Sequence, residues 1–374
     1  TTQPITNYVP ALQTAASGEP RFDHDPITGE SLGFLIEEQR TNLLPYSEQF
    51  DNAAWLKFRC SITTNTVVAP DGTLTGSKLV EDTDAINSYY LRETVTIVSG
   101  TTYTTSCYVK AAERSVVQLL QTNFGGGVAV AAFDLADQST LSDDEFTGTA
   151  IYDAGNNWYR ISATGVASST TTNSQIRISD TKTLDLAGYT GDGYSGVYIW
   201  GAQLEAGAFP TSYIKTTSAQ ATRNADAASM TGTNFSSWYR QDEGTVYGEY
   251  SSAQASGAFG FDDGTNNNRM RIGYTGSAPN LLSVANGSVQ VSVSTASLSE
   301  NTFGSVAASY KINDYALSLN GDSPQTDTNA LVPAVTKATI GVAQAVGNIN
   351  GHIKKLAFYP KRLSNATLQA LTEE

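Results

Sequence analysis

The chain has 374 residues, of which 40% are hydrophobic and only 16% are Asp, Glu, Lys or Arg. This length suffices for two or three domains with their own cores, and the frequent Tyr and Gly residues (19 and 32), with many Thr and Asn, favour strands and turns. The net charge of −14 argues against nucleic acid and anionic membrane surfaces as partners. No apolar run approaches 18 residues, so membrane insertion is not expected either.

Residues 1–42 are predicted to form an extended attachment segment. Four prolines, Pro4, Pro10, Pro20 and Pro26, forbid a long helix there. A turn at residues 25–29 separates the strand-like stretches 21–23 and 32–36, which predicts a small hairpin. The segment is either a plain linker or a piece that packs on a neighbouring subunit or attachment site.

Residues 43–215 contain many short strand-like runs at a spacing of about ten residues, which predicts a jelly-roll β-sandwich. Residues 216–230 are small and polar and are predicted to be a linker. Residues 231–374 repeat the all-β pattern and are predicted to form a second β-sandwich. The fold class expected is therefore all-β, with two sandwich domains in series.

The C-terminus predicts one last apolar strand at residues 351–359, a stop at Pro360 and a short helix. Ser364 is suited to be the N-cap of this helix, and Leu363 can pack onto Leu368 across the cap. A single C-terminal helix after a long all-β stretch is typical of a lectin-like sandwich.

Two cysteines occur, Cys60 and Cys107, both in strand-like runs. Two cysteines in so long a chain make no disulfide framework. Two buried thiols are the first interpretation, and a single cross-strand disulfide is the second.

The sequence offers little for catalysis. Its two histidines, His24 and His352, have no companions for a nucleophilic triad or a zinc site. We find no pair of acidic residues at alternate strand positions, as glycoside hydrolysis on a sandwich requires. No cofactor is expected except possible Ca²⁺, for which Asp262, Asp263 and Asn266 are the candidate ligands, although an Asx-rich turn explains these residues better.

Sugar binding would use exposed aromatic rings beside amide groups. Adjacent strand residues face opposite ways, so one of Tyr89 and Tyr90 should lie in the core and the other on the surface. Trp158 is expected to pack inward at the start of a strand, and core positions are expected for Trp55 and Trp200. The candidate sugar-binding residues are Asn87, Tyr89, Tyr90 and Trp158 in the first sandwich, and Trp238 and Tyr274 in the second.

Two parts of the chain, one N-terminal and one C-terminal, carry a resemblance to known families. Residues 40–55 (RTNLLPYSEQFDNAAW), the turn at residues 70–72 (PDG) and residues 201–214 (GAQLEAGAFPTSYI) resemble a carbohydrate-binding-module-like jelly roll of tailed-phage and prophage structural proteins. The lead-in at residues 20–26 and 35–38 resembles what precedes that module. Residues 307–310, the hairpin at residues 319–321 and the closing strand and helix resemble the laminin-G-like, concanavalin A-like lectin/glucanase sandwich.

The resemblance implies a virion protein, a head or tail fibre or spike that displays lectin-like modules on the particle surface and is a homo-oligomer, often a trimer. The interpretation we prefer is a non-enzymatic protein held to other virion proteins through the N-terminal segment, with host-surface glycan as the expected partner. A purely architectural or decoration protein is one alternative. A polysaccharide-degrading enzyme on the lectin/glucanase fold is the other, and the missing acidic pair argues against it.

Overall fold

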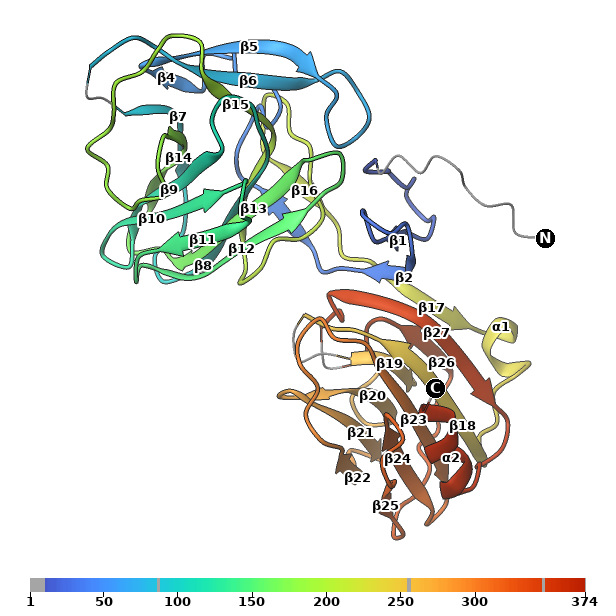
Figure 1. Ribbon diagram of the computed structural model, residues 1–374. Coiled ribbons are helices and arrows are strands. Elements are labelled where there is room, and N and C mark those ends of the chain that lie inside the picture. Colours follow the sequence, from blue (N-terminus) through green and yellow to red (C-terminus); the bar gives the residue numbers. More distant parts are fainter. Residues whose placement is uncertain (1–10, 86–87, 254–256, 345–346, 374) are drawn as a thin grey trace, which may run out of the picture. The chain divides into compact units, whose positions relative to one another are not determined.

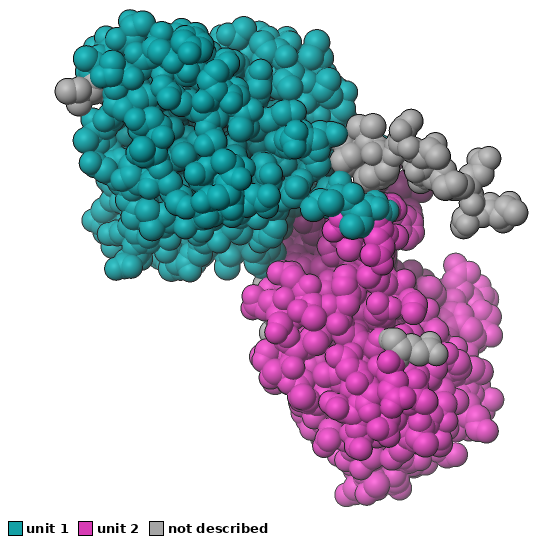
Figure 2. All heavy atoms as spheres, viewed as in Figure 1, with its two compact units in different colours: residues 1–14, 26–29, 40–223 teal, residues 15–25, 30–39, 224–374 magenta. Residues whose placement is uncertain are grey.

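The computed structural model describes residues 11–85, 88–253, 257–344 and 347–373 (Figure 1). These residues form two compact units, which Figure 2 shows in different colours. Of the described residues, unit 1 contains those within 11–14, 26–29 and 40–223, and unit 2 contains those within 15–25, 30–39 and 224–373. The fold is all-β, as predicted, because every strand pair between the named strands is antiparallel and helices are short and few in the described part.

Unit 1 is a sandwich of two six-stranded sheets and a two-stranded ribbon. Sheet I has the strand order β11 (Ser139–Ser142), β10 (Gly127–Asp134), β9 (Val116–Phe124), β14 (Thr171–Ser179), β7 (Tyr89–Thr96) and β4 (Leu56–Phe58). Sheet II has the order β12 (Phe146–Asp153), β13 (Tyr159–Val166), β8 (Thr102–Ala111), β15 (Gly196–Ala206), β6 (Gly76–Glu81) and β5 (Cys60–Val67). The ribbon pairs β3 (Arg40–Asn42) with β16 (Ala221–Arg223).

The core of unit 1 lies between sheets I and II. Strand β7 illustrates how it forms, because Tyr89, Leu91 and Val95 alternate inward while Tyr90 and Thr94 alternate outward. The core positions expected for two tryptophans are confirmed, since Trp55 and Trp200 are each 1% exposed.

Unit 2 is a second sandwich. Sheet III has the order β1 (Phe22–His24), β2 (Ser31–Ile36), β27 (Gly351–Tyr359), β18 (Glu243–Tyr250), β23 (Gly304–Lys311), β24 (Tyr315–Leu319) and β25 (Gln325–Asp327). Sheet IV has the order β17 (Ala228–Thr231), β26 (Lys337–Ile340), β19 (Gly257–Asp262), β20 (Arg269–Thr275), β21 (Ala278–Ala285) and β22 (Ser288–Ser294). Two helices complete it, α1 (Thr233–Ser236) and α2 (Asn365–Thr372).

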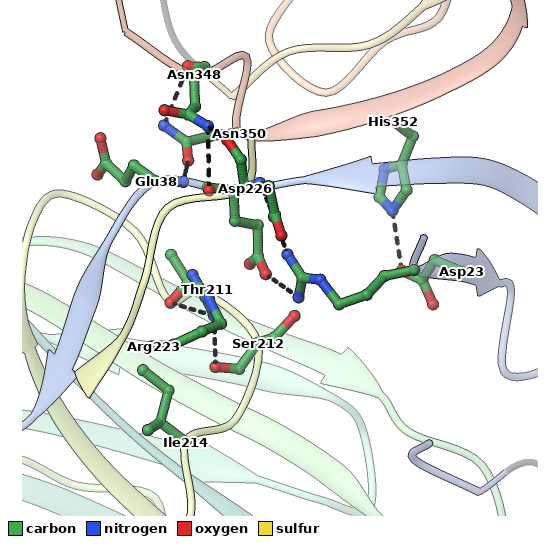
Figure 3. Close-up of polar contacts among 12 residues, drawn as sticks. Asp23, Glu38, Thr211, Ser212, Ile214, Arg223, Asp226, Asn348, Asn350 and His352 are labelled. Atoms are coloured by element: carbon green, nitrogen blue, oxygen red, sulfur yellow. Dashed lines mark hydrogen bonds and ion pairs between the residues drawn. The ribbon is translucent and has the colours of Figure 1, made fainter. Parts of the chain in front are cut away.

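The predicted N-terminal hairpin is present, as β1 and β2, but its strands belong to the second sandwich and do not form a segment of their own. Strand β2 pairs with β27, and Ile36 is fully buried in the core of unit 2. Polar contacts secure the end of this piece (Figure 3): the Glu38 N–H donates to Asn350 Oδ1 at 2.7 Å, and His352 Nε2 lies 2.9 Å from Asp23 Oδ2. Unit 1 is thus inserted, in sequence, between β2 and the rest of unit 2.

The range 216–230 is not the plain linker that the composition suggested. Strand β16 pairs with β3, and β17 pairs with β26. Between them, the Asp226 carboxylate accepts the Glu37 N–H at 2.7 Å, and the Asp226 carbonyl accepts Asn348 Nδ2 at 2.7 Å (Figure 3). The chain therefore enters unit 2 again through ordered backbone contacts.

The predicted C-terminal cap is confirmed. Ser364 Oγ accepts the Thr367 N–H at 3.2 Å at the start of α2. Leu363 and Leu368 belong to the same small apolar cluster, with Leu368 fully buried against sheet III.

The two cysteines are free thiols, so the disulfide alternative is wrong. Cys107 is buried and Cys60 is half-buried. Burial raises the pKa of both thiols to about 12, which makes them unreactive at neutral pH. Among the described residues, neither helix is long and apolar enough to cross a membrane.

Candidate functional site

Tyr89 cannot be a sugar-stacking residue. Its side chain is fully buried between sheets I and II. Two carbonyl oxygens, of Asp84 at 2.7 Å and of Tyr189 at 3.0 Å, lie within reach of its hydroxyl, which donates its one proton to either of them. The same hydroxyl accepts the Gly191 N–H at 2.7 Å. Tyr89 is therefore a core residue that anchors a loop, and the prediction is corrected for this residue.

Tyr90 has the opposite orientation. It lies on the outward side of β7, where its side chain is half-buried. The expectation that one of the two tyrosines is in the core and its neighbour outside is confirmed. Asn87, predicted beside them, lies outside the described residues.

The remaining aromatic candidates are packed inside their units. Trp158 is 1% exposed, and its indole N–H donates to the Val68 carbonyl at 3.0 Å. Tyr274 is 8% exposed and makes an edge contact with Tyr250. Trp238 is half-buried against Phe358, with ring centroids 4.9 Å apart. None of these three offers a free ring face, so they are corrected to core or core-border residues.

The candidate calcium ligands form a hairpin tip held by its own hydrogen bonds. The Asp262 side chain is 1% exposed, and its Oδ1 lies 3.1 Å from Lys337 Nζ. Asp263 Oδ1 accepts the Thr265 hydroxyl at 2.6 Å, and the Asn266 carbonyl accepts Arg269 Nη1 at 2.6 Å. No group of three or more His, Cys, Asp or Glu residues suited to a metal occurs in the described part of the chain. The Asx-turn interpretation accounts for these contacts.

Around Tyr90, sheet I brings together residues from strands far apart in sequence. Cross-strand pairing aligns Phe58 with Tyr90, Tyr90 with Arg177, and Arg177 with Gln118. A second row aligns Leu56, Arg92, Gln175 and Leu120. We call this side of the sheet the Tyr90 face. It is formed by strands β4, β7, β14 and β9, which are neighbours in that order in sheet I. Its residues are Leu56, Phe58, Tyr90, Arg92, Gln118, Leu120, Gln175 and Arg177.

The centre of the Tyr90 face is a three-part stack. The rings of Phe58 and Tyr90 are stacked, with centroids 4.9 Å apart and an interplanar angle of 16°. On the other side, the Arg177 guanidinium carbon lies 5.2 Å from the centroid of the Tyr90 ring, which is a cation–π contact. Phe58 is 37% exposed, which is a high exposed fraction for so large an apolar side chain. The stack thus presents aromatic surface at the edge of a polar strip.

Amide groups flank the stack and hold Arg177 in place. Its guanidinium donates to Ser88 Oγ at 2.7 Å, Gln118 Oε1 at 3.2 Å and Gln175 Oε1 at 3.4 Å. Gln118 is fixed in turn, because its Nε2 donates to the Thr183 carbonyl at 2.6 Å. Burial lowers the pKa of Arg177, although an arginine remains protonated at any physiological pH.

Sequence reasoning identified Tyr90 but missed Phe58, Arg177, Gln118 and Gln175. The signal for Phe58 was present, since Leu56 and Phe58 alternate with Lys57 in a short run. Nothing in the sequence pairs that run with residues 89–96, however, because the register between strands is set by the whole sheet.

The comparisons with known proteins leave the family open. No family model matches this sequence, and no curated protein matches it. Among solved structures, domains LG4-5 of the mouse laminin alpha1 chain are 9% identical, with 75% of this chain and 88% of that chain covered and a TM-score of 0.31. Trypanosoma rangeli sialidase is 9% identical, with 79% of this chain but only 60% of that chain covered and a TM-score of 0.32. TM-scores this low carry no argument, so the fold description rests on the strands of this chain itself.

Proposed function

We propose that this chain is a non-enzymatic display protein of a tailed-phage or prophage particle, and that the Tyr90 face of unit 1 contacts glycan on the host surface. The glycan part of the proposal rests on one observation, the stacked Phe58–Tyr90 ring pair, in which Phe58 is 37% exposed and Tyr90 is backed by the buried Arg177. The virion part rests on the resemblance carried by residues 40–55, 70–72 and 201–214.

The chemistry of the Tyr90 face suits a pyranose ring. The C–H side of a sugar packs on an aromatic ring, and its hydroxyls pair with amide and guanidinium groups fixed around that ring. Phe58 supplies the accessible ring and the half-buried Arg92 the accessible guanidinium. Gln118, Gln175 and Arg177 are buried, and their mutual hydrogen bonds hold the backing of the Tyr90 ring in position. Such preorganisation reduces the entropy lost when a ligand binds.

The proposal of no catalysis rests on the missing acidic pair in the sequence, and two carboxylates of the acidic stretch at residues 81–84 are occupied by arginines. Glu81 receives two hydrogen bonds from Arg114, at 2.6 and 3.0 Å, and Asp84 forms an ion pair with Arg59. Carboxylates fixed in this way act as structural partners and are not free to serve as an acid and a base. A reducing-sugar assay that gives turnover on host polysaccharide would favour the enzyme alternative.

The glycan proposal is tested with Phe58→Ala and Tyr90→Ala. Each variant should weaken binding to host cells and to glycan arrays by about tenfold or more, because each removes part of the stacking surface. Tyr152→Ala is the matched control, since Tyr152 is 51% exposed on β12 in sheet II, away from the Tyr90 face. Unchanged binding in both variants would remove the assignment to this face, and a wild type that binds no cell and no glycan would leave the architectural alternative.

Assembly is part of the same proposal. We propose a homotrimer that joins other virion proteins through its N-terminal region. Because β1 and β2 belong to sheet III, an attachment role of residues 15–39 would act through the edge of unit 2. Mass photometry of the purified chain tests the trimer, and a monomer at micromolar concentration would contradict it.

A further inference from the structure

Two arginines lie side by side on the Tyr90 face. Arg177 is opposite Tyr90 and Arg92 is opposite Gln175 in the pairing of β7 with β14, which makes the two arginines diagonal neighbours on one side of the sheet. Arg92 is half-buried, so part of its side chain is accessible, whereas Arg177 is only 6% exposed. The face therefore carries two positive charges at its centre.

Neither arginine forms an ion pair among the described residues, and Arg177 is held by neutral groups only. Other arginines of this acidic chain do pair with carboxylates; they are Arg21, Arg59, Arg114, Arg240 and Arg362. Among the outward-facing strand residues of sheet I, the one carboxylate is Asp134, at the far end of β10. Its Oδ1 already accepts Ser115 Oγ and the Ala136 N–H, each at 3.0 Å. Among the described residues, the two arginines of the face thus have no carboxylate as an ion-pair partner, although the chain has a net charge of −14.

A desolvated cation without a counter-ion is unfavourable, and an incoming anion would relieve that cost. Planar carboxylates match the guanidinium fork, and hydrogen bonds between charged groups are about twice as strong as neutral ones. The negative charge of the rest of the molecule would repel a densely charged polymer such as nucleic acid. A ligand with one carboxylate on each sugar fits both conditions.

We propose that the Tyr90 face selects an acidic sugar residue, a uronate or a sialate, whose ring packs on Phe58 and whose carboxylate pairs with the guanidinium of Arg92. Arg177 lies deeper and contributes its charge from behind Tyr90. This inference rests on the glycan-binding function proposed above and specifies the class of glycan.

The test compares acidic sugars with matched neutral ones by titration calorimetry. Oligogalacturonate is paired with its carboxyl-reduced form, and sialyllactose with lactose, so that the two carboxylate sources are told apart. The wild type should bind one acidic sugar at least about tenfold more tightly than its neutral partner, since a charge-assisted hydrogen bond is worth about that factor. Ionic strength is kept at about 0.15 M, where long-range repulsion from the rest of the chain is screened.

Arg92→Met should abolish the preference, so that the acidic sugar binds no more tightly than its neutral partner, and Arg92→Lys should retain part of the preference. Lys110→Met is the control, because it removes the same charge from β8 in sheet II. Thermal melting confirms that each variant is folded.

The outcomes separate this inference from the function beneath it. Equal affinity for acidic and neutral sugars, or a preference that persists in Arg92→Met, overturns the acidic-sugar inference and leaves glycan binding standing. Failure of the wild type to bind any of the four sugars, together with no binding to host cells, overturns both.

Discussion

At the scale of single residues, Glu93 is a buried carboxyl group. It is 6% exposed on the inward side of β7 between Leu91 and Val95, and its Oε2 has no hydrogen-bond partner. Desolvation raises the pKa of Glu93 to about 7, from an ordinary value of 4.5. The folded state therefore holds this proton more tightly than the unfolded state does.

This shift predicts a pH-dependent stability for unit 1. Because the folded pKa is raised, the contribution of the protonated carboxyl is fully present below about pH 4.5 and is lost as the pH rises through about 7. Glu93→Gln should remove that dependence and make the chain more stable than wild type at pH 8 by about 1–3 kcal/mol. Urea denaturation at pH 5 and pH 8, followed by tryptophan fluorescence, measures the difference.

Asp144→Asn serves as the control, because Asp144 is an exposed carboxyl group of the same unit. Its stability should follow that of the wild type at both pH values. A wild type and a Glu93→Gln variant that respond equally to pH would show that Glu93 is solvated when the protein is folded.

At the scale of single elements, α2 begins where its local sequence directs it. The Ser364 hydroxyl satisfies the Thr367 N–H, and Leu368 is buried against sheet III. Ser364→Ala should lower the free energy of unfolding of unit 2 by about 1 kcal/mol, and Ser364→Asp should retain most of it, because an aspartate can cap the same N–H group. Chemical denaturation of both variants tests this, and equal losses in the two would contradict the cap as the cause.

The strands of sheet I show what an element cannot specify alone. The alternation in residues 89–96 is enough to place one of Tyr89 and Tyr90 inward and the other outward. The neighbours of Tyr90 come from β4 and β14, which are separated from it by about 30 and 90 residues along the chain and carry no local signal of their pairing. The sequence therefore led to Tyr90 as one of two candidates on β7, and it led neither to Arg92 nor to the residues on the neighbouring strands.

At the scale of the whole molecule, the order of the chain makes unit 2 depend on residues that precede unit 1. Ile36 on β2 lies in the core of unit 2. It packs so closely on Gly341 that a Cβ atom at that position would lie only 2.5 Å from the Ile36 side chain. A fragment of residues 224–374 lacks β1 and β2, so it leaves one edge of β27 unpaired and a core position empty. This fragment should fail to fold and should aggregate.

Joining residues 15–39 directly to residues 224–374 should restore folding. Arg40 and Arg223 are paired across β3 and β16, so the chain leaves unit 2 and returns to it at neighbouring points, which a short Gly/Ser linker can connect. Near-ultraviolet circular dichroism and size-exclusion chromatography compare the two fragments. If residues 224–374 alone give a folded monomer, the N-terminal hairpin is dispensable for unit 2.

Features that depend only on residues close together in the chain could be predicted from the sequence. These are the all-β class, the hairpin around residues 25–29, the opposite orientations of Tyr89 and Tyr90, and the cap at Ser364. The tertiary structure alone decided that β2 joins β27 across more than 300 residues, and that Phe58, Arg92 and Arg177 share one face. The physical reason is that periodicity and capping are local, whereas strand partners and register are chosen by which arrangement buries the apolar faces of an entire sheet.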